Sequence, residues 1–158
     1  MEVVVAGDGP ESDKLKSLAS ALRIADRCKF LGAVSNDHVR KLLMQADYFV
    51  LPCRTDSAGD RDGIPVVLME AMACGVPVIS GDLPAIRELI AHGESGMLVD
   101  GNDATDVANA IQELERDAKL RMCVAEGGRK RVETEFSLEE NVSRLEKLLN
   151  VAWAPRPR

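Results

Sequence analysis

The stretch "DGIPVVLMEAMACGVPVIS", residues 62–80, decides the fold of this chain. Gly63 indicates a turn, Pro65 suits the first turn of a helix, and "PVIS" at 77–80 is typical of a buried strand. Glu70 stands in the middle of the apolar helix that this pattern predicts. A carboxylate in apolar surroundings costs free energy unless a partner compensates it, so we expect Glu70 to avoid open solvent and to need a partner.

Short apolar runs alternate with longer amphipathic runs on both sides of this stretch. The predicted strands are residues 2–7, 28–32, 48–52, 77–80 and 96–100, and the predicted helices between them are residues 10–25, 36–46, 65–74 and 84–91. This alternation predicts an α/β fold, a doubly wound Rossmann-like parallel sheet with helices on both faces. Five strands are few for such a sheet, so we expect that the domain is truncated upstream of Met1.

The last third of the chain is predicted to be helical. A helix begins near Asp103 or Thr105, and a later one begins at Ser137, which forms a capping box with Glu140. Prolines end the helical pattern after residue 150. We therefore predict one domain over residues 1–150 and a tail over 151–158.

Composition excludes several classes of partner. Aromatic residues are 3% of the chain and the formal net charge is −6, which disfavours nucleic acids. The basic run at 127–133 is interpreted as a solvated helix face. Four cysteines without C-x-x-C spacing indicate small core residues in a reducing compartment. No apolar segment is long enough for a membrane anchor, so we expect a cytoplasmic protein.

Two glycines follow the first predicted strand and precede a helix. The amides around Gly7 and Gly9 could face a phosphate at that helix start, or the glycines could form a plain tight turn. Binding of NAD is disfavoured, because Ser12 replaces the third glycine of the dinucleotide fingerprint and no acid ends the second strand.

The helix start after Pro65 favours an anion, specifically a diphosphate. The amides of Val66 and Val67 have no acceptor within the helix, and the positive end of the helix dipole lies there. Asp62 and Glu70 would flank that anion and accept hydrogen bonds from the hydroxyls of a ribose or hexose. The alternative is that Glu70 is an exposed helix residue and Asp62 a loop acid.

Four segments together resemble a known family: "GDGP" after a strand, "FLG" before a polar helix start, the long run from "ADYFVLP" to "AIRELI", and "GESGMLVDGND". They are similar to the nucleotide-binding C-terminal half of family-four retaining glycosyltransferases of the GT-B fold. The resemblance covers nearly the whole chain. It implies that the chain is one half of a GT-B fold, the Rossmann-like domain that binds a nucleotide-sugar donor.

The resemblance also implies roles for individual residues. The paired acids of the family match Asp62 and Glu70, the expected catalytic residues, with Glu70 on the ribose hydroxyls and Asp62 near the hydroxyls of the donor sugar. The loop "GDLPA" at 81–85 would face the acceptor domain. The residues expected to bind the donor are Gly7, Gly9, Leu31, Gly32, Val34, Gly63, Ile64, Pro65, Val66, Val67 and Glu70.

For the parent protein the resemblance implies transfer of a hexose from a nucleotide sugar to a hydroxyl acceptor, without cofactor or metal, in glycan or polysaccharide biosynthesis. The acceptor, a carbohydrate or lipid-linked molecule, would bind a missing N-terminal domain. The chain alone is expected to be inactive, because the basic residues that neutralise the diphosphate in the family precede this segment. A nucleotide-sugar epimerase-like domain and a non-catalytic nucleotide-sugar-binding module remain as alternatives.

Overall fold

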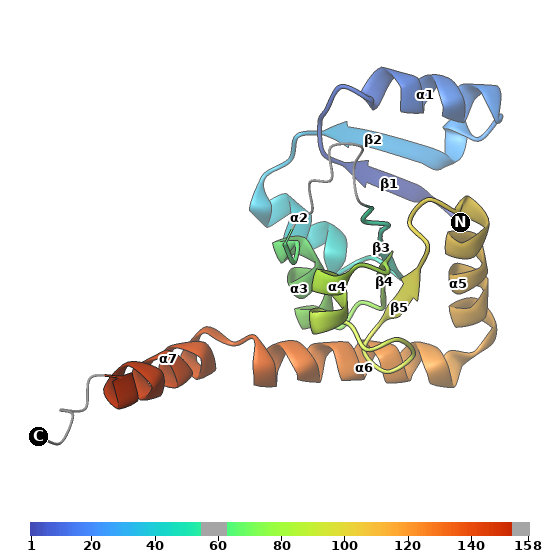
Figure 1. Ribbon diagram of the computed structural model, residues 1–158. Helices are drawn as coiled ribbons and strands as arrows, with labels where there is room; N and C mark the ends of the chain where they lie inside the picture. Colours follow the sequence, from blue (N-terminus) through green and yellow to red (C-terminus); the bar gives the residue numbers. More distant parts are fainter. Residues whose placement is uncertain (55–62, 153–158) are drawn as a thin grey trace, which may run out of the picture. The chain divides into compact units, whose positions relative to one another are not determined.

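The structure, a computed structural model, describes residues 1–54 and 63–152. Strands and helices alternate along the chain (Figure 1). The strands are β1 (Val3–Ala6), β2 (Cys28–Gly32), β3 (Phe49–Leu51), β4 (Val78–Gly81) and β5 (Met97–Val99). The helices are α1 (Ser12–Ala21), η1 (Ala25–Arg27, a 3-10 turn), α2 (Asn36–Leu43), α3 (Val66–Ala73), α4 (Pro84–Leu89), α5 (Ala104–Arg116), α6 (Ala118–Glu135) and α7 (Leu138–Ala152). All five strands predicted from the sequence are present.

The described strands pair in two parallel sheets. β1 pairs with β2, and β3, β4 and β5 pair in that order. The chain divides accordingly into two compact units, Met1–Leu42 and Leu43–Arg158. The predicted parallel α/β class is confirmed, and the strands form sheets of two and three strands instead of one sheet of five.

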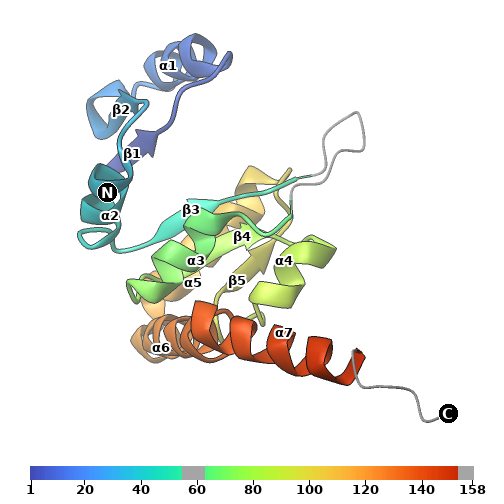
Figure 2. The same cartoon turned by 90° about the vertical axis from the view of Figure 1, so that its left-hand side faces the viewer.

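The unit Leu43–Arg158 contains most of the buried apolar residues. Its central strand β4 is fully buried, with Val78 and Ile79 both 0% exposed. Figure 2 shows α3 on one side of the β3–β4–β5 sheet and α5 on the other. On the α5 side Ile79 joins a cluster with buried residues of β5, α5 and α6, namely Met97, Val99, Ala110, Leu114 and Val124. This packing fixes the carboxyl ends of the three strands.

Helix α6 crosses close to the loop before β5 because it carries two adjacent glycines. A Cβ atom at Gly127 would overlap the carbonyl group of Glu94, and one at Gly128 would lie 2.9 Å from the carbonyl oxygen of Ser95. Arg129 and Lys130 of the predicted basic run are exposed as expected, and Arg129 pairs with Glu133 at 2.8 Å on the same helix. The prediction of a solvated face is wrong for Arg131, which is partly buried. The run therefore combines a tight helix contact with an exposed charged face.

The predicted caps of the C-terminal helices are confirmed. The Asp103 carboxylate accepts a hydrogen bond from the amide of Thr105, and the Ser137 hydroxyl accepts one from the amide of Glu140. The second half of the predicted capping box is not formed, because the Glu140 carboxylate accepts from Arg144 at 3.1 Å. The expectation that the cysteines are core residues is wrong: all four are free thiols, Cys123 is exposed and the other three are partly exposed.

Tyr48 joins the start of β3 to two helices. Its hydroxyl donates to Glu115 at 2.7 Å and accepts from Arg121 at 3.2 Å. Partial burial and the Glu115 carboxylate raise the pKa of the Tyr48 phenol above its ordinary value. We expect Tyr48→Phe to lower the free energy of unfolding by about 0.5–1.5 kcal/mol, because it removes these bonds and keeps the ring. Urea denaturation at neutral pH measures this; an unchanged midpoint would show that the bonds contribute nothing net.

Candidate functional site

The start of α3 lies at the surface, as the sequence predicts for an anion-binding helix end. Pro65 has extended backbone angles and its carbonyl accepts from the amide of Leu68 at 3.0 Å, so the helix begins at Val66. The amides of Val66 and Val67 have no acceptor within the helix. The side chain of Val66 is 64% exposed, which leaves this helix end open to solvent.

The expectation that Glu70 avoids solvent is wrong, because its side chain is exposed. Helix α3 buries Leu68, Ala71 and Met72, which leaves Val66 and Glu70 one turn apart on its open face. The apolar sequence around Glu70 packs on the side of the helix away from it. Its exposure agrees with the alternative of a surface helix residue, and it also leaves the carboxylate accessible to a ligand. Asp62 lies outside the described residues.

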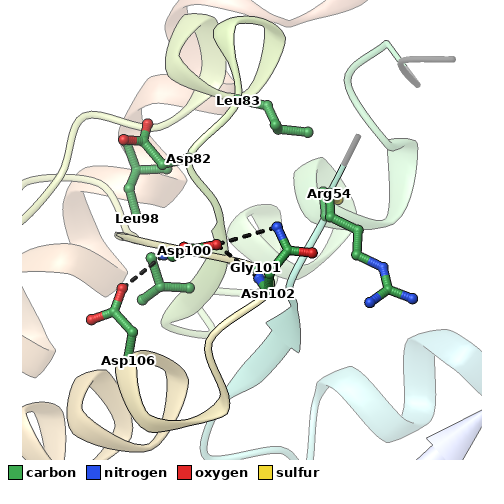
Figure 3. Close-up of a pocket in the computed structure, with 10 residues that line it drawn as sticks. Arg54, Asp82, Leu83, Leu98, Asp100, Gly101, Asn102 and Asp106 are labelled. Atoms are coloured by element: carbon green, nitrogen blue, oxygen red, sulfur yellow. Dashed lines mark hydrogen bonds between the residues drawn. The ribbon is translucent and has the colours of Figure 1, made fainter. Parts of the chain in front are cut away.

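A pocket of about 410 Å³ lies at the carboxyl ends of β3, β4 and β5 (Figure 3). Ligands of parallel α/β sheets bind at this edge. The residues that line it are Cys53, Arg54, Asp82, Leu83, Leu98, Val99, Asp100, Gly101, Asn102 and Asp106. The loop that the resemblance assigns to the acceptor side contributes Asp82 and Leu83 to it. Glu70 and the predicted donor-binding residues 63–67 are not among the lining residues.

Polar groups of the loop after β5 are bonded to one another. The Asp106 carboxylate accepts from the amide of Asp100 at 2.7 Å, and the Asp100 carboxylate accepts from the amide of Asn102 at 2.9 Å (Figure 3). Arg54 is the basic residue among the described residues that line the pocket. The sequence patterns did not point to Arg54, Asp100, Asn102 or Asp106, although the positions of Arg54 and Asn102 two residues after predicted strands were a usable signal.

Two arginines hold the loop 81–85 and the helix that follows it. Arg87 donates to both carboxylate oxygens of Asp82, at 2.5 and 2.8 Å. From α6, Arg131 donates to the carbonyl oxygen of Glu88 at 3.0 Å, near the last turn of α4. Bidentate pairing fixes orientation as well as distance, so Asp82 points toward Arg87.

The pair of Asp82 and Arg87 makes a small part of the stability depend on pH. The hydrogen bonds from Arg87 hold the pKa of the Asp82 carboxyl below its ordinary value. A carboxyl group whose pKa is lower in the folded state than in the unfolded state stabilises the fold at pH values above its unfolded-state pKa. This contribution to stability is lost as the pH falls through the folded-state pKa. We expect the stability difference between wild type and Asp82→Asn to be largest near neutral pH and to shrink in acid. Urea denaturation at several pH values measures it; a difference independent of pH would contradict the assignment.

A second pocket, of about 500 Å³, lies within the unit Met1–Leu42. Gly7, Gly9 and Gly32, three of the predicted donor-binding residues, line it. The amide of Gly7 donates to the Gly32 carbonyl at 2.8 Å, and the amide of Gly9 donates to Asp8 at 2.9 Å. Gly7 has φ of 134°, which only glycine adopts readily. Because both amides are already bonded, these observations favour the tight-turn alternative.

The two other donor-binding residues predicted in the first unit do not line this pocket. Leu31 is exposed at the end of β2, and Val34 is partly exposed in the following loop. The structure therefore brings Gly7 and Gly9, after β1, together with Gly32 at the end of β2. Gly63 to Glu70 lie in the other unit, around the start of α3.

Within residues 1–54 and 63–152, no three His, Cys, Asp or Glu side chains gather in a group suited to a metal. In the same segments, no helix combines the length and apolarity needed to span a bilayer.

Comparison with known proteins identifies the family. Residues 1–131 match the family described as glycosyl transferases group 1. The chain belongs to this glycosyltransferase family. The match confirms the resemblance found in the sequence and favours a glycosyltransferase over the epimerase-like alternative.

Curated members of the family are similar to this chain at 35–37% identity. A GDP-mannose-dependent α-(1-6)-phosphatidylinositol monomannoside mannosyltransferase of Mycobacterium tuberculosis is 35% identical over 90% of this chain and 37% of its own length. The N-acetyl-α-D-glucosaminyl L-malate synthase of Bacillus anthracis is 37% identical over 92% of this chain and 36% of its own length. The chain thus spans little more than a third of these relatives.

Solved structures agree with the fold. Sucrose-phosphate synthase from Thermosynechococcus elongatus matches with a TM-score of 0.79 and 26% identity, over 96% of this chain and 39% of its own. HepE of Anabaena in complex with UDP-glucose matches with a TM-score of 0.77 and 25% identity, over 94% of this chain and 41% of its own. The parallel α/β architecture is therefore that of glycosyltransferases of known structure.

Proposed function

We propose that this chain is the donor-binding part of a retaining glycosyltransferase that transfers a hexose from a nucleotide sugar to a hydroxyl acceptor in glycan or polysaccharide biosynthesis. The observation that carries the proposal is the family match over residues 1–131. Relatives named as a mannosyltransferase and as an amylovoran biosynthesis glycosyltransferase support it, as does the HepE structure with UDP-glucose. The acceptor, a carbohydrate or a lipid-linked molecule, is bound by a part of the protein outside residues 1–158.

The start of α3 is proposed to hold the diphosphate of the donor. The amides of Val66 and Val67 point out of the helix end, where the helix dipole favours an anion. Glu70 is exposed one turn further along the same face as Val66. A diphosphate at the helix end would bring the attached ribose toward this carboxylate, which can accept hydrogen bonds from both ribose hydroxyls.

Asp62 is the proposed partner of the donor sugar. It immediately precedes Gly63, four residues before the helix start at Val66, and a carboxylate there would orient the hydroxyls of the hexose. The fixed amides of α3 would stabilise the negative charge that develops on the departing diphosphate. We propose that this chemistry uses no metal ion, and that residues 1–158 alone turn over poorly because the charge on the diphosphate is only partly compensated.

Calorimetric titration of the purified chain tests donor binding. UDP, GDP and ADP are each titrated free and linked to a sugar, with the matching nucleoside as a control that lacks the diphosphate. The proposal predicts that one base is preferred and that its nucleoside binds more weakly than its diphosphate, because the helix end contacts phosphate. Equal binding of nucleoside and diphosphate would contradict the role of α3. Absence of binding by every nucleotide would contradict donor binding by this chain.

A non-catalytic nucleotide-sugar-binding module remains as the second candidate. The chain matches only 36–37% of the length of its curated relatives. The two candidates differ in the turnover of the longer protein that contains the chain: the glycosyltransferase transfers the sugar, and the module only binds the nucleotide sugar. Release of nucleoside diphosphate by that longer protein in the presence of acceptor extract distinguishes them: release indicates the glycosyltransferase, and binding without release indicates the module.

A further inference from the structure

Two glycines hold together the walls of the pocket of about 410 Å³ at the carboxyl ends of β3, β4 and β5, the strand-end pocket. A Cβ atom at Gly81, the end of β4, or at Gly101, after β5, would overlap the carbonyl oxygen of Cys53. A Cβ atom at Gly101 would also lie 2.9 Å from the carbonyl oxygen of Pro52. The backbone after β3 therefore contacts the ends of both other strands. All lining residues belong to the unit Leu43–Arg158, so the pocket is preformed within one unit.

The loop after β5 supplies polar groups that its own hydrogen bonds leave available. The Oδ1 atom of Asp100 accepts from the backbone amide of Asn102 at 2.9 Å and from its side-chain amide at 3.3 Å (Figure 3). Within residues 1–54 and 63–152, the second carboxylate oxygen of Asp100 and the side-chain oxygen of Asn102 accept no hydrogen bond. Both side chains are exposed and line the pocket. Asp106 fixes this arrangement, because its carboxylate accepts from the amide of Asp100 at 2.7 Å.

The charges of the lining residues disfavour an anion. Asp100 and Asp106 carry carboxylates, and Arg54 is the basic residue among the described residues of the lining. The third carboxylate, that of Asp82, is compensated by Arg87 at 2.8 Å. A metal ion is disfavoured as well, because no three side chains of the described segments form a group suited to one. A neutral ligand with hydrogen-bonding groups fits this lining better than an ion does.

Apolar residues beside the polar groups narrow the class of ligand to a sugar ring. Leu83, from the loop after β4, and Leu98 of β5 line the same pocket (Figure 3). A sugar ring carries hydroxyl groups at its edge, which donate to carboxylates, and apolar C–H groups on its faces. The pocket volume lies in the range of small-molecule sites, which combine apolar walls with a few polar groups.

We propose that the strand-end pocket binds one neutral sugar ring. Asp100 and the side-chain oxygen of Asn102 accept hydrogen bonds from its hydroxyls, and Leu83 and Leu98 contact its C–H groups. The site is additional to the proposed diphosphate site, because the helix start of α3 does not line the pocket. The proposal therefore goes beyond the proposed function and stands even when α3 binds no nucleotide. The sugar has two sources, the hexose of a nucleotide-sugar donor or a sugar unit of a carbohydrate acceptor.

NMR titration of the isotope-labelled chain tests the binding. The probes are the methyl glycosides of mannose, glucose and N-acetylglucosamine, with inorganic phosphate and putrescine as charged controls. At least one glycoside should shift the amide signals of residues 98–102 in a saturable manner and leave those of α1 unchanged. Saturable shifts by phosphate or putrescine in place of a glycoside, or none by any glycoside, would overturn the proposal.

Two matched variants identify the residues that bind. Asp100→Asn should weaken glycoside binding by about tenfold, because one carboxylate oxygen becomes a donor while the other still accepts from Asn102. Asp47→Asn removes the same charge from an exposed position before β3, at the opposite edge of the sheet, and should bind as the wild type does. Urea midpoints show whether both variants fold equally well. Equal glycoside affinity of the two variants would contradict the role of Asp100.

Nucleotide sugars separate the two sources of the sugar. For a donor hexose, Asp100→Asn should weaken binding of the nucleotide sugar and leave binding of the nucleoside diphosphate unchanged, and the glycoside should compete with the nucleotide sugar. For an acceptor sugar, the glycoside should bind together with saturating nucleotide sugar. Failure of the proposed function is a separate result, because absence of nucleotide binding leaves the glycoside titration interpretable.

Discussion

Gly81→Ala is expected to lower the free energy of unfolding by about 3 kcal/mol, which is near the upper end of the usual cost of adding a carbon atom to a packed core. Gly81 is the last residue of the buried strand β4. A Cβ atom at this position would overlap the carbonyl oxygen of Cys53 and lie 2.7 Å from the carbonyl carbon of Cys53. These are backbone atoms, which cannot rotate away as a flexible side chain could. A hydrogen bond at 2.8 Å from the Ser80 hydroxyl to the Leu51 carbonyl holds the same two strands together. The added methyl group must therefore push β3 and β4 apart.

Urea denaturation of Gly81→Ala beside Gly63→Ala measures this effect. Gly63 is exposed, has no Cβ contact within 4 Å, and is not in the left-handed region, so the control should change stability little. The substitution should also disturb the pocket at the strand ends, because Cys53 and Arg54 line it. Equal stability of the two variants would show that β3 adjusts freely and that the contact is not restrictive.

Glu70→Gln is expected to weaken nucleotide binding by about 1–3 kcal/mol, the range for loss of hydrogen bonds to a charged group. Under the proposed function its carboxylate accepts from both ribose hydroxyls, and the neutral amide replaces one acceptor oxygen with a donor. Because Glu70 is exposed and α3 buries its opposite face, the substitution should leave the fold unchanged. Calorimetric titration with the preferred nucleoside diphosphate measures the loss.

The matched control is Glu126→Gln, the same change at an exposed position of α6. It should bind the nucleotide as the wild type does. Equal affinities of wild type and Glu70→Gln would remove Glu70 from the ribose site, whatever the nucleotide. A similar loss in both variants would also contradict a specific role of Glu70, because the removal of a negative charge by itself favours the binding of an anion.

Local patterns predicted the elements well because they depend on neighbours in the sequence. Alternation of apolar runs located β1 to β5, Pro65 marked the start of α3, and Ser137 capped α7. The motif combination also indicated the glycosyltransferase family, which the match over residues 1–131 confirms. Asp62, the other acid of the proposed pair, lies outside the described residues, so its role stays a prediction.

What the sequence determined by itself was the order and type of the elements and the family. The tertiary structure decided what depends on residues distant in the chain. Glu70 faces solvent because α3 packs against the sheet through the side that carries Leu68, Ala71 and Met72. The strands pair as two sheets, β1 with β2 and β3 with β4 and β5, and this pairing joins residues that are far apart in the sequence. The close approaches at Gly81 and Gly127 follow from the crossing of backbones far apart in sequence. Local propensity carries no information about these contacts, since hydrogen-bond pairing and packing are nonlocal.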